Sequence, residues 1–220
     1  MGKMAPQENP LVNNKKLRQM YAAMVGARAL DEYVARKGKR KKAGQIDSTR
    51  GEEACRVSTA IELIAGDLVS DDRVGVVMDF IAGATVASLL RRVAFQSGAK
   101  ERKAKSVTPK GAAQMPWIED AGERLRLAEG AALAFKTFKK PNLVVCYVRS
   151  GEVAGGVWRR VLGIASRLEL PILFGVLPDP GNGKRKSAGE GLAQAHAGRV
   201  PCIPVDASGA VALYRGAQES

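Results

Sequence analysis

The chain has 220 residues, of which 45% are hydrophobic and 26% are charged. That length and composition allow a sizeable buried core and exclude an intrinsically disordered protein. The 35 lysines and arginines outnumber the 22 aspartates and glutamates, so the formal net charge is +13. Such a charge favours anionic partners but does not choose among phosphorylated ligands, nucleic acid and an acidic protein surface.

We predict a tail over residues 1–14 followed by a single domain over residues 15–220. The first ten residues contain no apolar run of the kind that a signal peptide needs, and Pro6 stands where a myristoylation motif requires Ser or Thr. We therefore expect a cytoplasmic protein that does not enter the membrane. Cys55, Cys146 and Cys202 each lie in an apolar pattern, which predicts reduced core thiols rather than disulfides or a zinc site.

Helical periodicity dominates the first part of the chain. Apolar residues at helical spacing predict a helix over residues 15–36, with the asparagines at 13 and 14 as its possible caps. A second helix is predicted over residues 52–65, with Ile64 on its buried face and Gly66 ending it in the left-handed conformation. Both helices are expected to pack their apolar faces on the core.

The segments around these helices are less regular. Residues 74–78 are predicted to form a short strand, and residues 81–95 a third helix. The basic run 36–42 is interpreted as a solvated loop, and a nucleic-acid patch and a targeting signal are the alternatives. Residues 98–111 combine many lysines with almost no apolar periodicity, which predicts a loop.

Short apolar runs alternate with helical patterns in the second half of the chain. In order, these are a helix over 127–138, an apolar run over 143–148, a helix over 157–168, an apolar run over 171–177, a third run over 202–205 and a helix over 208–216. Apolar runs that flank a crossover helix imply parallel strands covered on both faces. The pattern therefore predicts an α/β fold with a doubly wound, mostly parallel sheet.

In an open parallel sheet, ligands bind beyond the carboxyl ends of the strands, and two loops of this chain take that position. These loops, 149–156 and 178–184, offer glycines for close backbone approach, cations for a phosphate and oxygen ligands for magnesium. The candidate cofactor-binding residues are Arg149, Ser150, Gly151, Glu152, Gly155, Gly156, Asp179 and Asn182, with Lys184 as a further cation. Glycine-rich turns are more often tight connections without a ligand, and that interpretation stays open.

These loops also resemble a known family. The stretch from Gly151 to Leu177 is similar to the segment that joins the Gly-Asp-Gly triplet to the Asn-Asn pair in α-subunits of thiamine-diphosphate-dependent 2-oxo acid dehydrogenases. The resemblance continues in the family's order at Leu17–Tyr33, Gly51-Glu52-Glu53-Ala54, Gly66-Asp67, Gly130–Ala134 and Val205-Asp206. It implies a thiamine-diphosphate-binding fold and oxidative decarboxylation of a 2-oxo acid. It also implies thiamine diphosphate and magnesium as cofactors, and a second copy or a β-type subunit as partner.

The chain departs from the family pattern where the cofactor would bind. When the stretches are aligned on the Leu-Pro pair at 170–171, Ser150 replaces the aspartate that ligates magnesium, and Pro178-Asp179 replaces the Asn-Asn pair. Magnesium needs oxygen ligands, and a proline side chain supplies none. The family's Tyr-Arg pair has no clean counterpart beside Arg73, and His196 is the single histidine of the chain.

These departures predict a catalytically silent or repurposed homologue, so no catalytic residue is assigned. The chain also ends earlier after its last predicted helix than the family's α-subunits do, which fits the same expectation. Two alternatives remain open, an assembly or regulatory partner and an unspecific polyanion-binding protein. The basic loops carry few interleaved aromatic residues for base stacking, so specific nucleic-acid binding is not expected.

Overall fold

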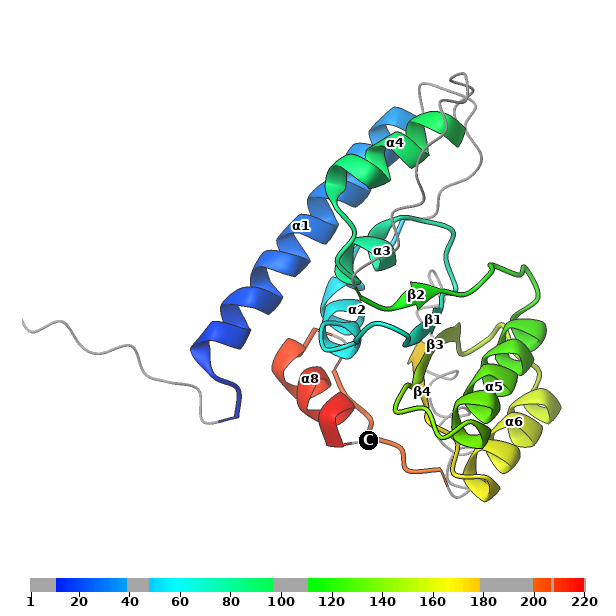
Figure 1. The fold of residues 1–220 in the computed structure, drawn as a ribbon. Helices are drawn as coiled ribbons and strands as arrows, with labels where there is room; N and C mark the ends of the chain where they lie inside the picture. Colours follow the sequence, from blue (N-terminus) through cyan, green and yellow to red (C-terminus); the bar gives the residue numbers. More distant parts are fainter. Residues whose placement is uncertain (1–10, 39–47, 97–110, 179–199, 207, 220) are drawn as a thin grey trace, which may run out of the picture.

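One parallel sheet organises the fold of residues 11–38, 48–96, 111–178, 200–206 and 208–219, which are the residues that the computed structural model describes. The strands of this sheet are β1 (Leu68–Ser70), β2 (Ala113–Gln114), β3 (Val144–Arg149) and β4 (Ile172–Leu177). They lie in the order β2-β1-β3-β4, and every neighbouring pair is parallel (Figure 1). The predicted α/β class with a parallel sheet is confirmed.

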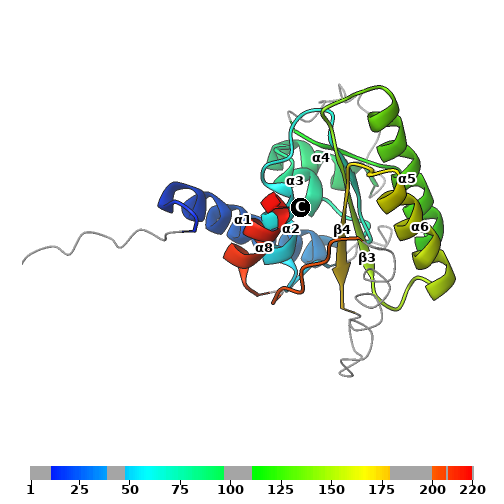
Figure 2. The same ribbon diagram turned by 90° about the horizontal axis from the view of Figure 1, so that it is seen from below.

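Helices cover both faces of this sheet. The helices are α1 (Asn14–Gly38), α2 (Glu53–Ala60), α3 (Val77–Ile81), α4 (Val86–Gln96), α5 (Ala121–Thr137), α6 (Gly155–Arg167) and α8 (Ala210–Glu219). Helices α5 and α6 lie side by side on one face, whereas α2, α3 and α8 lie on the other (Figures 1 and 2). The sheet is therefore the middle layer of a three-layer arrangement.

Strand β3 shows why the sequence folds this way, because it is buried on both sides. Val144, Cys146 and Val148 pack in the core cluster under α5 and α6. Val145 and Tyr147 alternate with them and pack in the cluster that includes residues of α2. A run rich in β-branched and aromatic residues suits a strand without a solvent face. The predicted βαβ unit of β3, α6 and β4 is confirmed, since β3 and β4 pair in parallel.

The strand order creates a reversal point between β1 and β3. The chain passes from β1 to β2 on one side of β1, and β3 then pairs with the opposite side of β1. In open α/β sheets the crevice at such a switch point, beyond the carboxyl ends of the strands, is the usual place for a ligand. The residues that follow Ser70 and Arg149 lie at this edge.

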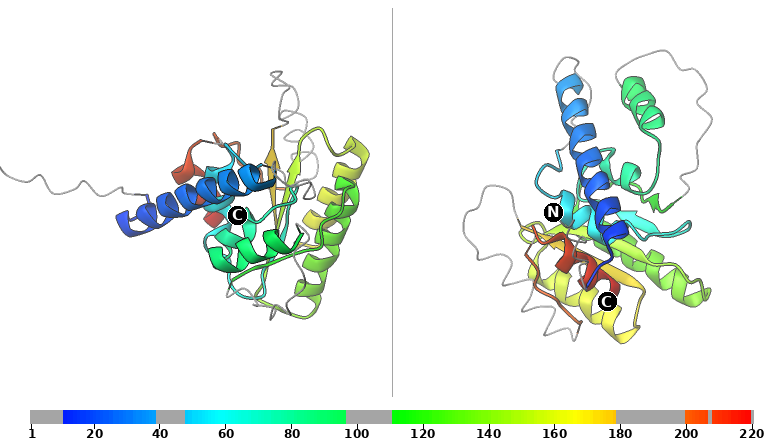
Figure 3. Two further views of the ribbon diagram at one scale, coloured as in Figure 1. Left: turned by 90° about the horizontal axis from the view of Figure 1, so that it is seen from above. Right: turned by 90° about the vertical axis from the view of Figure 1, so that its left-hand side faces the viewer.

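Helix α1 runs along the outside of the molecule (Figure 3), and Asn13 caps it by accepting a hydrogen bond from the Lys16 backbone N–H at 2.8 Å. Its residues Leu30 and Val34 pack in the same small core cluster as residues of α4. The predicted first helix is confirmed, and so is the helix near the carboxyl end, α8. None of the described helices is long and apolar enough to span a membrane.

Two predictions about the first half are wrong. Residues 74–78 do not form a strand, since α3 begins at Val77, and the strand of this region is β1. At three residues β1 is too short to show an alternating pattern. Helix α2 ends at Ala60, and Ile64 is 56% exposed, because the Asp67 carboxylate accepts a hydrogen bond from the Ile64 backbone N–H at 2.7 Å and makes a turn.

Further boundaries differ from the sequence prediction. The third helix, α4, begins at Val86, with Thr85 accepting a hydrogen bond from the Ser88 backbone N–H at 3.3 Å. Residues 202–205 are described without strand structure, so the predicted last strand is wrong. Most of the basic run 36–42 and nearly all of the predicted loop 98–111 lie outside the described residues.

Candidate functional site

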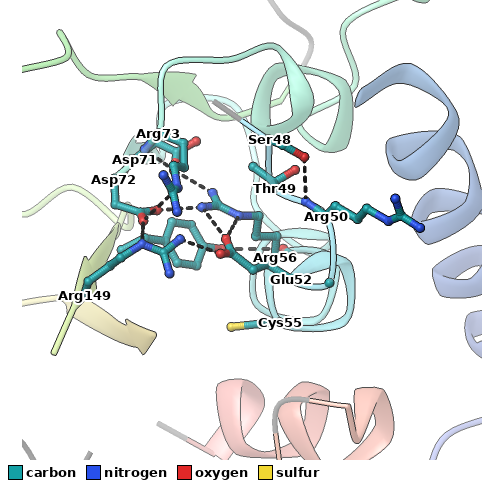
Figure 4. A network of polar contacts seen from close by, with 12 residues as sticks. Ser48, Thr49, Arg50, Glu52, Cys55, Arg56, Asp71, Asp72, Arg73 and Arg149 are labelled. Atoms are coloured by element: carbon teal, nitrogen blue, oxygen red, sulfur yellow. Dashed lines mark hydrogen bonds and ion pairs between the residues drawn. The ribbon is translucent and has the colours of Figure 1, made fainter. Parts of the chain in front are cut away.

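A buried network of charged side chains fills the switch-point crevice. Its centre is Arg56 on α2, whose side chain is 0% exposed (Figure 4). The Arg56 guanidinium donates to Glu52 at 3.0 and 3.1 Å, to Asp71 at 2.5 Å and to Asp72 at 2.6 Å. It also stands 5.0 Å from the centre of the Tyr147 ring, a cation–π distance.

Arg149, the last residue of β3, joins the same carboxylates from the other side of the crevice. Arg149 is 4% exposed, and it donates hydrogen bonds to Glu52 and, at 2.8 Å, to the backbone carbonyl of Pro178. Its Nε lies 2.9 Å from Asp72 Oδ2 with the alignment of an ion pair rather than a hydrogen bond. The guanidinium groups of Arg56 and Arg149 thus share the carboxylates of Glu52 and Asp72. These ion pairs join the end of β3, the end of β1 and α2.

The two neighbouring carboxyl groups after β1 have opposite pKa shifts. Burial, together with the adjacent charge of Asp72, raises the pKa of Asp71 to about 6 despite its contact with Arg56. Burial also opposes the ionisation of Asp72, but Arg56 and Arg149 outweigh burial and lower the pKa of Asp72. A pair of carboxyl groups separated in this way holds one permanent charge and one proton that exchanges near neutral pH.

The Gly-Glu-Glu-Ala segment at 51–54 supplies a second anchor. Glu53 accepts hydrogen bonds from Arg28 of α1, including one of 2.8 Å to Oε2, and from the Gly51 backbone N–H at 3.0 Å. Burial of Glu53 disfavours its charge, but these hydrogen bonds prevail and lower its pKa. Within this segment, Glu52 therefore bonds to the arginines at the sheet edge, and Glu53 bonds to Arg28 of α1.

The described candidate residues follow one another along the turn from the end of β3 to the start of α6. Ser150 follows β3, and its backbone N–H donates to the Leu177 carbonyl at 3.0 Å. Gly151 and Glu152 lie in the turn that follows, and Glu152 pairs with Arg124 of α5 at 2.9 Å. Gly155 and Gly156 begin α6. The two remaining candidates, Asp179 and Asn182, lie outside the described residues, as do Lys184 and His196.

The hollow beside the loop 149–156 also has the wrong charge for a phosphate. It measures about 310 Å³, and its lining carboxylates come from Asp120, Glu123 and Glu152, against one guanidinium from Arg126. A β-carbon built on Gly156 meets nothing within 4 Å, so no close contact in this structure requires glycine there. These features support a tight connection rather than a phosphate cradle.

The described residues do not fit the magnesium and diphosphate that the resemblance implies. Arg149 brings a buried positive charge to the end of β3, where a divalent cation would need anionic oxygens. Glu152, a possible replacement ligand, is held by Arg124. Among the described residues, no group of three or more His, Cys, Asp or Glu side chains is placed to hold a metal ion.

Sequence reasoning missed Arg56, Asp71 and Asp72. The available signals were an arginine four residues after Glu52 on an amphipathic helix, and an Asp-Asp-Arg run directly after Ser70. Neither signal was interpretable while β1 was unrecognised. The structure agrees with the prediction of free thiols, because Cys55, Cys146 and Cys202 form no disulfide. Cys55 and Cys146 are also buried, as predicted for core thiols.

Comparison with known proteins leaves the chain without an assigned family. No protein-family model matches it, and no match was found among curated proteins.

Proposed function

We propose that this chain is a non-catalytic relative of the thiamine-diphosphate-dependent dehydrogenase α-subunits, in which the cofactor clamp has become a structural ion-pair network. The observation that carries the proposal is the position of Arg149. The resemblance places this residue on the first glycine of the Gly-Asp-Gly triplet, and its side chain is buried against Glu52 and Asp72.

Charge explains why this arrangement opposes cofactor binding. A magnesium ion at the end of β3 would meet the Arg149 guanidinium, and a diphosphate would have to draw that guanidinium away from two carboxylates. Separating a buried ion pair costs about 3–5 kcal/mol because one charge is left unpaired in a medium of low polarity. Binding of either the metal or the diphosphate would therefore destabilise the fold.

Calorimetric titration of the whole chain with thiamine diphosphate, with and without magnesium, tests the proposal. We expect no magnesium-dependent binding. The double variant Ser150→Asp, Pro178→Asn restores the two ligand positions, and we expect it to gain no magnesium-dependent affinity while Arg149 remains. Tight magnesium-dependent binding by the unchanged chain would refute the proposal. A gain in the double variant alone would place the loss at residues 150 and 178 instead of at Arg149.

We further propose an assembly role, in which α1 pairs with α1 of a second copy. The exposed face of this helix carries residues at alternating spacings of four and three, which places them in one row along the helix. These residues are Arg18, Ala22, Val25, Ala29, Glu32 and Arg36, all exposed. Tyr21, 67% exposed, flanks this row.

The charges along this row select an antiparallel second copy. If a two-fold axis passes at Val25, Arg18 lies opposite Glu32 of the other copy, and the same pair forms again at the other end. Tyr21 then lies opposite Ala29, where the small side chain leaves room for the ring. A parallel pairing would instead place like charges together, which is unfavourable.

Sedimentation of charge-reversed variants tests this assembly. We expect the unchanged chain to dimerise and Arg18→Glu or Glu32→Arg to weaken the dimer at least 10-fold. The double variant carrying both changes should recover the dimer, because the pairs re-form with reversed sign. Arg159→Glu, on the exposed side of α6, is the matched control and should have no effect. A monomer at all concentrations, or a double variant no better than the single ones, would refute the pairing.

A further inference from the structure

The amino edge of the sheet, opposite the ion-pair network, brings together loops that are far apart in the sequence. Strands β1, β3 and β4 begin level with one another, because Leu68 is in register with Val144 and Val144 is in register with Ile172. The loops that lead into these parallel strands therefore lie at the same edge. Asn142, before β3, also donates from Nδ2 to the carbonyl of Ala65, before β1, at 3.3 Å. The loops thus form one surface.

Each of these three loops exposes a large apolar side chain. Ile64, before β1, is 56% exposed, Phe138, before β3, is 72% exposed, and Leu168, before β4, is 42% exposed. Phe138 and Leu168 are the C-cap residues of α5 and α6. The Lys136 ammonium donates a hydrogen bond to the Leu168 carbonyl and so joins these two helix ends. One exposed apolar side chain is ordinary, but three on adjoining loops indicate a surface that meets an apolar environment.

Cations stand beside these apolar side chains. Lys139 and Lys140 directly follow Phe138, and Arg167 directly precedes Leu168. All three cations are exposed, and no carboxylate of the described residues forms an ion pair with them. The nearby carboxylates already have partners: Glu62 pairs with Lys16 at 2.6 Å, Glu169 pairs with Lys136 at 3.4 Å, and the buried Asp67 accepts hydrogen bonds from Asn142 and from the Ile64 backbone. Three cations are thus set against one buried carboxylate, and the edge is positively charged.

We propose that this amino edge docks on the surface of a membrane that contains anionic lipids, with Ile64, Phe138 and Leu168 entering the headgroup boundary. Long cationic side chains reach the anionic headgroups while the apolar side chains leave water beside the acyl chains. An acidic protein surface suits the edge less well, because lysine is depleted from protein interfaces. The inference is independent of the relation to the dehydrogenases and of the pairing through α1.

Sedimentation with lipid vesicles tests the proposal on the whole chain. We expect binding to vesicles of phosphatidylcholine with about one third phosphatidylserine, weaker binding as the salt concentration rises, and no binding to pure phosphatidylcholine. Phe138→Ser should weaken the binding about 10-fold, because the apolar side chain no longer leaves water. Leu127→Ser, at a 39% exposed position in the middle of the same helix, is the control and should bind unchanged. Equal binding to both kinds of vesicle, or unchanged affinity of Phe138→Ser, would overturn the proposal.

A matched pair of glycine variants separates the charge of the edge from its folding. Lys139 and Glu169 follow Phe138 and Leu168 with φ of 53° and 43°, in the left-handed region where glycine is the usual residue. Lys139→Gly and Glu169→Gly should therefore both raise the melting temperature. Lys139→Gly should nevertheless weaken vesicle binding about 5-fold, whereas Glu169→Gly should strengthen it by a similar factor. Effects of the same sign on vesicle binding would contradict the proposal.

Tryptophan emission reports insertion directly. Phe138→Trp should shift its emission to shorter wavelength when the anionic vesicles are added, and Leu127→Trp should not. The two native tryptophans are common to both variants, so they do not affect the comparison. Poly-glutamate, a soluble polyanion, should shift neither variant. Tighter binding to poly-glutamate than to the vesicles would identify an acidic protein surface as the occupant of this edge and would overturn the proposal.

Discussion

Two regions at the carboxyl edge of the sheet satisfy their polar side chains to different degrees. Between β1 and β3, Arg56 and Arg149 are surrounded by Glu52, Asp71 and Asp72, and the charges satisfy one another. Between β1 and β2, the buried Arg73 Nε and Gln114 Nε2 have no hydrogen-bond partner among the described residues. Both positions lie at carboxyl ends of parallel strands. The comparison teaches that the position of a polar group in the sheet does not by itself decide whether its hydrogen bonds are satisfied. The partners that the fold brings to it decide this.

The largest effect is expected where the network is fully buried. Arg56→Met keeps the length of the side chain but leaves Asp71 and Asp72 without their guanidinium partner, so the free energy of unfolding should fall by about 3–5 kcal/mol. Urea unfolding followed by circular dichroism measures it. Arg50→Met, an exposed arginine near the same helix, is the control and should change little. Equal effects of the two variants would show that the network does not stabilise the fold.

A smaller loss is expected from Gly175→Ala on β4. A β-carbon there would lie 2.7 Å from Cδ1 of Tyr147, whose ring stands beside Arg56 and whose hydroxyl is 2.6 Å from Thr59 Oγ1. The ring must move, and the free energy of unfolding should fall by about 1–3 kcal/mol. Unfolding curves of Gly175→Ala and Gly163→Ala make the comparison, since residue 163 has nothing within 4 Å. A stable Gly175→Ala variant would mean that the ring is not tightly held.

Asp71→Asn tests the region between β1 and β3. The pKa of Asp71 is about 6 in the folded chain and ~3.9 when unfolded, so the folded chain binds more protons between these values. The contribution of this group to stability therefore falls as the pH rises from about 4 to about 6. The stability of the variant relative to the unchanged chain should rise by on the order of 2 kcal/mol across this window.

Urea unfolding at several pH values from 4 to 7 measures this difference. Glu119→Gln, an exposed acid, is the control and should show no such window. A difference between Asp71→Asn and the unchanged chain that stays constant with pH would show that Asp71 titrates normally.

The smallest effect is expected at Gly156, which was a candidate for close approach to a phosphate. Its added β-carbon meets nothing, and alanine is a better helix residue than glycine, so Gly156→Ala should stabilise the chain by about 0.5 kcal/mol. Thermal unfolding measures the change. A loss of stability would show that the start of α6 needs glycine for a reason outside the contacts described, and would revive the phosphate interpretation of the loop 149–156.

Much of the fold was predictable because its signals are local. The spacing of apolar residues indicated α1, α5 and α6, and the continuous apolar runs indicated β3 and β4. These patterns survive in the structure since each element buries the face that its own sequence marks as apolar. β1 escaped prediction because its three residues become a strand through pairing with β2 and β3, which come later in the chain.

The candidate site divides in the same way. The sequence by itself determined that charged and glycine-rich segments follow the ends of β3 and β4, and it placed Arg149 at the sheet edge. Only the tertiary structure decided what Arg149 does there, because its partners Glu52 and Asp72 are 97 and 77 positions away along the chain, counted from the residue numbers. The charge state and partners of a buried side chain depend on the groups that the fold brings within a few ångströms. These groups lie far apart in the sequence, so no periodicity or spacing predicts their contact.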